Sequence, residues 1–139
     1  MKLMIMNKKT GIDTNILIYA IDTSFPLKKK ISENLIDSLP VINTQCISEF
    51  ANICIRKFNF DKVTTLQIIN RILKKCVIQN CSASTYLLAE KIMKHYQFQL
   101  FDSIIIASSL ESGCETFFTE DLHHGLLIEK QLRICNPFK

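Results

Sequence analysis

Short apolar segments alternate with longer helix-periodic segments along this chain, and no other feature constrains its fold as strongly. Strands are predicted at residues 10–13, 41–43, 76–80, 116–119 and 133–135. Parallel strands need long crossover connections, usually helices, which cover both faces of the sheet. The alternation therefore predicts an α/β fold, a three-layer α/β/α sandwich with a central parallel sheet.

The segments between these strands carry helix signals. Helices are predicted over residues 15–20, 45–58 and 101–110, the last ended by Gly113. Further helices are predicted to begin near Pro26, after Asp61 and at Ser82 or Ser84, and Thr44 is the predicted N-cap of helix 45–58. Apolar residues at helical spacing predict one buried stripe of Leu27, Ile31, Leu35 and Leu39, and another of Val63, Leu66, Ile69 and Leu73.

Length and composition fit one globular domain spanning residues 1–139. The apolar start at residues 1–6 is too short for a membrane span or a signal-peptide core, so we expect a cytoplasmic protein that does not interact with membranes. The six cysteines show no zinc-ligand spacing and are expected to be reduced, buried side chains. The net charge of +4 is compatible with a polyanionic partner, although Lys28-Lys29-Lys30 is typical of a solvated helix face.

Four of the 13 acidic residues lie in apolar surroundings. Asp13 stands in GIDTNIL, Glu49 in CISEFA, Asp102 in LFDSIII and Asp121 in FFTEDL. Buried carboxylates are costly unless they are neutralised, paired or bound to a metal. Simpler interpretations remain open at this point, because each aspartate could be a helix N-cap and Glu49 could face water.

A divalent cation explains the four acids together. Asp13 ends the first predicted strand and Asp121 follows a later one, so both are expected at the carboxyl edge of the sheet, where α/β proteins bind ligands. The chain has only three arginines and three histidines to balance them. Carboxylates and water are the ligands that Mg²⁺ or Mn²⁺ prefers. A zinc site at His123-His124 is disfavoured, since no third soft ligand is near, and no phosphate-binding glycine loop is present.

Four segments, in order, resemble the PIN-domain nucleases, and within them the VapC-like toxins of bacterial type II toxin–antitoxin pairs. These are DTNILIYA, the helix containing Ser48-Glu49-Phe50, FDSIIIASSLESGC, and FFTEDLHHG followed by ICNPF. The resemblance covers essentially the whole chain. It implies the same α/β/α fold and Mg²⁺- or Mn²⁺-dependent cleavage of RNA, an endoribonuclease activity.

The resemblance also implies site residues and partners. Asp13, Glu49, Asp102 and Asp121 would be the catalytic, metal-binding acids, with polar Thr14, Asn15 and Thr119 orienting them and Glu120 beside them. Either Glu120 or Asp121 could be the fourth acid; the family's Thr/Ser-x-Asp pattern favours Asp121. The implied partners are an RNA substrate, a small cognate antitoxin and a second copy of the chain in a homodimer.

Two other functions are compatible with the sequence. A non-catalytic PIN-like module would bind protein or RNA while the acids act as helix caps, but such a module would be expected to lack one or more of the four acids. A metal-dependent phosphatase is weaker, because the DxDxT nucleophile motif is missing. The complete acid set favours the nuclease.

Overall fold

The structure is a computed structural model that describes residues 8–139. The expectation about residues 1–6 therefore lies outside the described residues. Among the described residues, six strands form one sheet in the order β3-β2-β1-β4-β6-β5, and only β5 runs antiparallel to its neighbour. The strands are β1 (Thr10–Ile12), β2 (Val41–Asn43), β3 (Val77–Gln79), β4 (Thr116–Phe118), β5 (Leu127–Ile128) and β6 (Leu132–Cys135).

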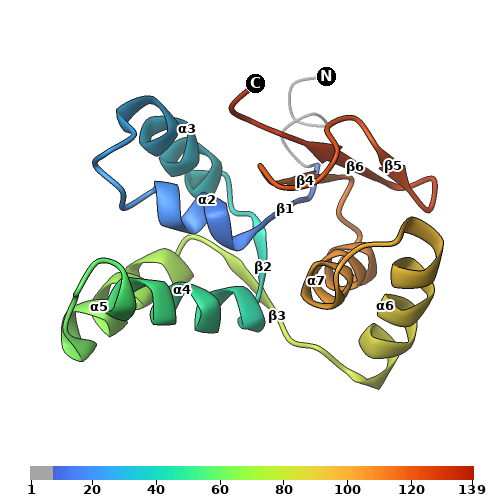
Figure 1. Cartoon of the computed structure of the whole chain (residues 1–139), viewed down its shortest axis with the longest axis horizontal. Coiled ribbons are helices and arrows are strands. Elements are labelled where there is room, and N and C mark those ends of the chain that lie inside the picture. Colours follow the sequence, from blue (N-terminus) through green and yellow to red (C-terminus); the bar gives the residue numbers. More distant parts are fainter. Residues whose placement is uncertain (1–7) are drawn as a thin grey trace.

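The helices form two groups on either side of the central strands (Figure 1). In this view β1, β2 and β3 lie between the two groups. The predicted α/β/α sandwich with a mostly parallel sheet is confirmed. The first group comprises α2 (Thr14–Tyr19), α3 (Pro26–Asp37), α4 (Thr44–Arg56) and α5 (Lys62–Leu73), and the second comprises α6 (Ala83–Tyr96) and α7 (Leu100–Glu111).

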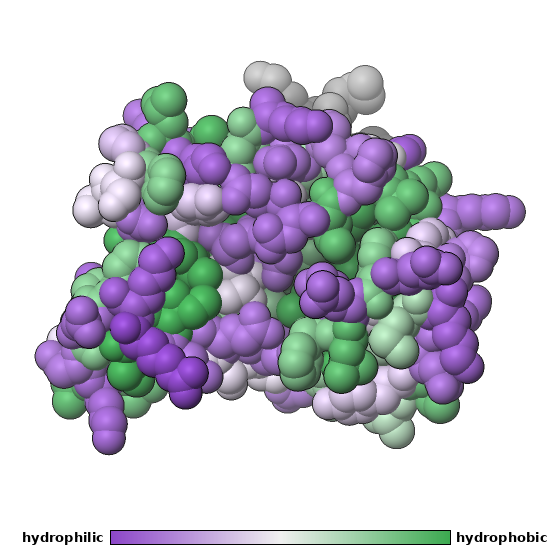
Figure 2. Space-filling model, viewed as in Figure 1, coloured by the Kyte–Doolittle hydropathy of each residue, from purple (hydrophilic) through white to green (hydrophobic). Residues whose placement is uncertain are grey.

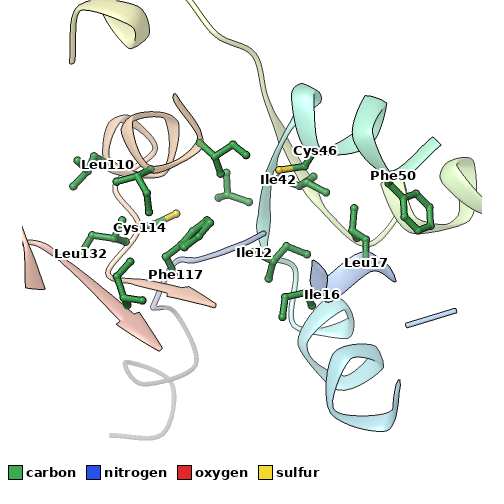
Figure 3. Close-up of a cluster of buried hydrophobic side chains, with 14 of the residues drawn as sticks. Ile12, Ile16, Leu17, Ile42, Cys46, Phe50, Leu110, Cys114, Phe117 and Leu132 are labelled. Carbon is green, nitrogen blue, oxygen red and sulfur yellow. The ribbon is translucent and has the colours of Figure 1, made fainter. Parts of the chain in front are cut away.

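The core fills the space between the sheet and both helix groups (Figure 3). Ile12 and Phe117 come from the two central strands, Ile16 and Leu17 from α2, and Phe50 from α4. All five are at most 1% exposed. Burying such side chains stabilises the fold by roughly 1.5–3 kcal/mol each, so these residues fix the position of β1 and α2, from which the first acid projects.

Helix α7 is the most deeply buried helix, because every residue from Ser103 to Leu110 is buried. A helix that is apolar on all sides must be surrounded by protein. It packs against α6 and against β2. This burial fixes the first turn of α7, which carries Asp102, beside the carboxyl ends of the strands.

Two predicted buried stripes are wrong in detail. In the first stripe, Leu27 is exposed in α3 and Leu39 is exposed beyond the end of the helix, and the buried residues of α3 are Ser32 and Ile36. Steps of four residues advance about 40° around a helix, so a stripe spaced in this way drifts off any single contact line. Helix α3 instead uses a narrow face to pack against α2.

Helix α5 also departs from its predicted stripe. Val63 and Leu66 are exposed, whereas Thr65 and Ile69 are buried and Leu73 is partly buried. Among the described helices and strands, only α4 packs closely against α5, so only one narrow face of α5 is covered.

The structure also refines the predicted helix ends and adds a strand near the C-terminus. The N-cap of α4 is Asn43, whose side chain accepts from the Gln45 N–H, and Thr44 is the first helical residue. Asp61 caps α5 as predicted, Ser82 rather than Ser84 caps α6, and Gly113 takes a left-handed φ of 78° after α7. Strand β5 was not predicted, because two residues give too short a pattern to detect.

On the face shown in Figure 2, hydrophilic and hydrophobic residues are intermixed, and the hydrophobic ones form separate patches. Within residues 8–139, no helix combines the length and the apolar character needed to span a membrane. All six cysteines are free thiols; Cys46, Cys54 and Cys114 are buried and the other three partly buried.

Candidate active site

Asp13 follows β1 directly and is 6% exposed. Its carboxylate is the N-cap of α2: Oδ1 accepts from the Thr14 N–H at 2.7 Å, and Oδ2 accepts from the Thr119 hydroxyl at 2.8 Å. Burial raises the pKa of Asp13 to about 6, and the nearby charges of Asp102 and Asp121 add to this, while the two hydrogen bonds oppose it. The cap interpretation is therefore correct for Asp13, but the cap alone does not offset the cost of burying this carboxylate.

The four acids predicted from the sequence line one cavity of about 520 Å³. Asp13 comes from the end of β1, Glu49 from α4, Asp102 from the first turn of α7 and Asp121 from the loop after β4. This cavity, called the acidic cavity below, lies where α2, α4 and α7 approach the carboxyl ends of the central strands, the usual ligand-binding edge of such sheets.

Asp102 and Asp121 are not helix caps. Gln99 is the N-cap of α7, which places Asp102 inside the first turn, and Asp121 lies in a loop. Burial raises the pKa of the half-buried Asp102 carboxyl, and the negative charges of Asp121 and Glu49 raise it further. The carboxylates therefore interact electrostatically across the cavity.

The three polar side chains predicted to orient the acids hydrogen-bond to them. The Thr14 hydroxyl donates to Glu49 Oε2 at 3.1 Å, and the Thr119 hydroxyl donates to Asp13. Asn15 Nδ2 donates to Asp121 Oδ2 at 3.0 Å. The backbone N–H of Asp121 in turn donates to Thr119 Oγ1. These bonds join the loop after β4 to the start of α2, so Thr14, Asn15 and Thr119 lie where they can orient the carboxylates.

Glu120 lies apart from the acidic cavity. Its carboxylate pairs with Lys28 Nζ and accepts from the Tyr19 hydroxyl at 2.6 Å. Asp121 lines the acidic cavity and Glu120 does not. Residues 120–122 form a bend just after β4, and this bend takes the two neighbouring acids to different surroundings.

No cation from the part of the chain that the structure describes pairs with the acids of the cavity. Across residues 8–139, all five ion pairs involve other carboxylates. A set of four carboxylates with neighbouring hydroxyl and amide oxygens matches the preference of Mg²⁺ or Mn²⁺ for oxygen ligands. In the same described range, however, no three His, Cys, Asp or Glu side chains already form a group that could hold a metal ion. The donor chemistry fits a divalent ion, and the side chains would have to converge on it.

The rest of the lining was not predicted as part of a site. Gln45, Ser48 and Asn52 come from α4, and Phe101 precedes Asp102 in α7. Helical spacing could have identified two of them, since Gln45 and Asn52 lie four residues before and three residues after Glu49. The remaining lining residues are apolar: Ile18, Ile53 and Ile105.

Comparison with known proteins agrees with this geometry. The family model of the PIN domain matches residues 12–125, a range that contains all four acids. The chain belongs to the PIN-domain family. A comparison with curated protein sequences gives no match.

Three solved structures share the PIN fold of this chain. A toxin–antitoxin complex from Klebsiella pneumoniae has a TM-score of 0.67 at 19% identity, covering 94% of this chain and 98% of the other. VapBC2 from Rickettsia felis, bound to a promoter DNA fragment, has a TM-score of 0.62 at 16% identity, covering 81% and 87%. Mycobacterium tuberculosis VapC20, a Sarcin-Ricin loop cleaving toxin, has a TM-score of 0.63 at 13% identity, covering 81% and 92%.

Proposed function

We propose that this PIN-domain protein is a divalent-metal-dependent endoribonuclease and the toxin of a type II toxin–antitoxin pair. One observation carries the proposal: four carboxylates from separate parts of the chain line a single cavity, and none of them is ion-paired within the described residues. Such an arrangement destabilises the fold unless a ligand neutralises it, which is typical of sites kept for function.

Asp13 and Asp102 are the proposed principal ligands of Mg²⁺ or Mn²⁺, with Glu49 and Asp121 completing the site. A bound divalent ion would lower the pKa of a water and balance the charge that develops on the phosphoryl oxygens. Thr14, Thr119 and Asn15 keep the carboxylates oriented through the hydrogen bonds described above.

Hydrolysis then needs little else from the chain. A carboxylate of the cavity accepts the proton of the attacking water as its oxygen bonds to phosphorus. The bond from phosphorus to the leaving ribose oxygen breaks, and that oxygen takes a proton from solvent. No Lys or Arg is among the described lining residues, so the basic groups that would bind the RNA backbone must lie outside the cavity.

The proposal is tested with purified protein and RNA. Cleavage should require Mg²⁺ or Mn²⁺ and stop when EDTA is added. Asp13→Asn should lower the rate by at least about a hundredfold, because losing even a residue that orients a metal ligand commonly costs ten- to hundredfold. Unchanged cleavage in excess EDTA would contradict the mechanism, and full activity of a folded Asp13→Asn variant would contradict the site.

The toxin role includes a protein partner and a second copy of the chain. Two of the similar structures are toxin–antitoxin complexes, which supports a small antitoxin as partner. Expression of the chain alone should arrest growth, and Asp13→Asn should relieve the arrest. Light scattering should give the mass of a homodimer. A monomer at micromolar concentration would contradict the proposed homodimer.

The competing function is a non-catalytic module that binds protein or RNA. It is favoured by one observation: the acids do not yet converge as a metal-binding group in the described residues. This hypothesis predicts no cleavage and no stabilisation by Mn²⁺. The same RNA assay, together with melting curves, therefore separates the two functions.

A further inference from the structure

We propose that the apolar part of the acidic cavity is a subsite for one nucleobase of single-stranded RNA. Phe101 would stack on the base beside the scissile phosphate, and Asn52 would bind the edge of that base. This inference rests on the proposed nuclease function and adds a binding site to it. Its substrate class is a nucleotide with an unpaired, splayed-out base, because a base inside a duplex offers no free face.

The position and exposure of Phe101 carry the first step. Its side chain is 58% exposed although it is large and apolar, and it lines the acidic cavity next to Asp102. An exposed aromatic ring beside a phosphate-processing site is the usual platform for unpaired bases, since every base has a face that can stack. No described aromatic ring pairs with Phe101, so no other ring stacks on it.

The floor beside Phe101 supplies apolar surface. Ile18 from α2, Ile53 from α4 and Ile105 from α7 line the same cavity. The volume of about 520 Å³ is within the range of pockets that bind small organic ligands. A hydrated metal ion alone would not need this apolar surface, whereas a base next to the reacting phosphate would bury it.

The face of α4 that carries Glu49 supplies hydrogen-bonding groups. Gln45 and Asn52 flank Glu49 at helical spacing, so all three lie on one side of the helix. The Gln45 amide donates to Glu49 at 3.4 Å. Asn52 is exposed, and its amide has no hydrogen-bond partner among the described residues. An amide offers a donor and an acceptor together, which suits it to the edge of a base.

Leu100 provides the contrast that separates a base site from a general docking face. It adjoins Phe101 and is 55% exposed, but it lines a different groove between α6 and α7 with Tyr86 and Leu87. That groove holds one charged residue, Glu90, and none of the four acids. Only Phe101 shares its cavity with the proposed catalytic groups, so a nucleobase is favoured there over a protein segment.

The test is a fluorescence titration that does not depend on cleavage. A short single-stranded RNA containing 2-aminopurine, whose emission falls on stacking, is titrated with full-length protein carrying Asp13→Asn so that the RNA stays intact. Adding Phe101→Ala should weaken binding at least about fivefold and reduce the quenching. Phe101→Tyr should retain both, Phe101→Leu should lose the quenching, and Leu100→Ala should change neither.

Three outcomes overturn the stacking subsite. These are unchanged binding and quenching with Phe101→Ala, equal quenching with Phe101→Leu, and an equal loss with Leu100→Ala. Unchanged RNA binding with weakened antitoxin binding would assign Phe101 to a protein interface and also overturn it. If the wild type cuts RNA while Phe101→Ala cuts and binds equally well, the subsite is wrong and the nuclease proposal stands. If the wild type cuts no RNA, the nuclease proposal is wrong, and the titration alone decides whether Phe101 stacks on bases.

A second arm tests Asn52 through base preference. The kcat/KM values of wild type are compared for RNAs that differ in one nucleotide beside the cut. Asn52→Ala should reduce the ratio between the best and worst base at least about fivefold, since edge recognition is the source of discrimination. Ser48→Ala is the matched control, because Ser48 lines the cavity from the same helix while its hydroxyl donates to the Thr44 carbonyl. An unchanged ratio in Asn52→Ala would overturn the role of Asn52.

Discussion

Two neighbouring regions of this molecule differ in whether their carboxylates are paired with a cation. In the acidic cavity, Asp13, Glu49, Asp102 and Asp121 have no cationic partner within the described residues. One residue from Asp121, Glu120 pairs with Lys28 and accepts from the Tyr19 hydroxyl. The fold can therefore place a lysine beside an acid at this edge. Of the adjacent Glu120 and Asp121, it does so only for Glu120 among the described contacts.

The second region also surrounds its lysine with aromatic rings. Lys28 Nζ lies 4.7 Å from the ring centroid of Tyr19, 5.6 Å from that of Phe25 and 5.3 Å from that of Phe138. We call Tyr19, Phe25, Lys28, Glu120 and Phe138 the Lys28 cluster. Cation–π contacts and the ion pair satisfy each charge internally. The comparison teaches that the unpaired acids do not reflect a shortage of cations, since the chain has 17 lysines and arginines for 13 acids.

The largest expected difference between the two regions is in how their contributions to stability depend on pH. The folded pKa of Asp13 is raised from 3.8 to about 6, so between these values the native state binds more protons than the unfolded state. Its contribution to stability is full below about pH 4 and is lost as pH rises through 6, by up to about 3 kcal/mol.

The measurement is urea unfolding in EDTA from pH 4 to 7. The difference in unfolding free energy between wild type and Asp13→Asn should fall as pH rises. Glu120 behaves with the opposite sign: burial raises its pKa, but the hydrogen bonds from Lys28 and Tyr19 outweigh burial and lower it, so its contribution is lost as pH falls. A pH-independent difference in unfolding free energy between wild type and Asp13→Asn would contradict the raised pKa of Asp13.

Metal binding should stabilise the acidic cavity alone. Mn²⁺ at a hundredfold excess over its dissociation constant should add about 2.7 kcal/mol to the stability of wild type at pH 7. Asp102→Asn should raise the melting temperature of the metal-free protein, because it removes a repelling charge, and should shrink the gain from Mn²⁺. Glu120→Gln is the control and should keep the full gain. Identical melting curves with and without Mn²⁺ in all three proteins would contradict the metal site.

The two adjacent acids should differ in catalysis. Asp121→Asn should lower turnover at least about tenfold, about 1.4 kcal/mol in the activation barrier, since Asp121 lines the cavity. Glu120→Gln should have a smaller effect, because Glu120 is bound to Lys28 and Tyr19. Single-turnover cleavage rates of both variants measure this. The reverse ranking would make Glu120 the fourth acid of the site.

The smallest expected effect belongs to the Lys28 cluster itself. Lys28→Met should lower the melting temperature slightly, because the ion pair with Glu120 is partly exposed and such pairs contribute little. The loss should diminish at high salt, which screens the pair. Thermal melts at low and high salt would show it, with Lys30→Met as a control, because Lys30 is exposed in the same helix and takes part in none of the described ion pairs. An effect that grows with salt would argue that packing of the lysine stem, not the charge, stabilises this region.

The sequence determined the architecture through its periodicity. Apolar runs of three or four residues alternating with helices leave few arrangements other than a parallel sheet between helices, and the strands appear where they were predicted except for β5. The sequence also identified the acids that would share one cavity, because a carboxylate such as Asp13 is conspicuous in an apolar run. Both features are local, so they can be seen without the fold.

Tertiary structure alone decided which surfaces and partners each residue acquired. Leu27 and Leu66 carry the same apolar side chain as Leu17, yet only Leu17 is buried, because neighbouring helices cover one narrow face of α3 and α5. Glu120 and Asp121 are adjacent in the chain, and only the folded loop sends one to Lys28 and the other to the acidic cavity. Which distant side chains meet depends on how the helices and strands pack. Helical and strand periodicity reports which way a side chain points along its own element, but not what lies opposite it.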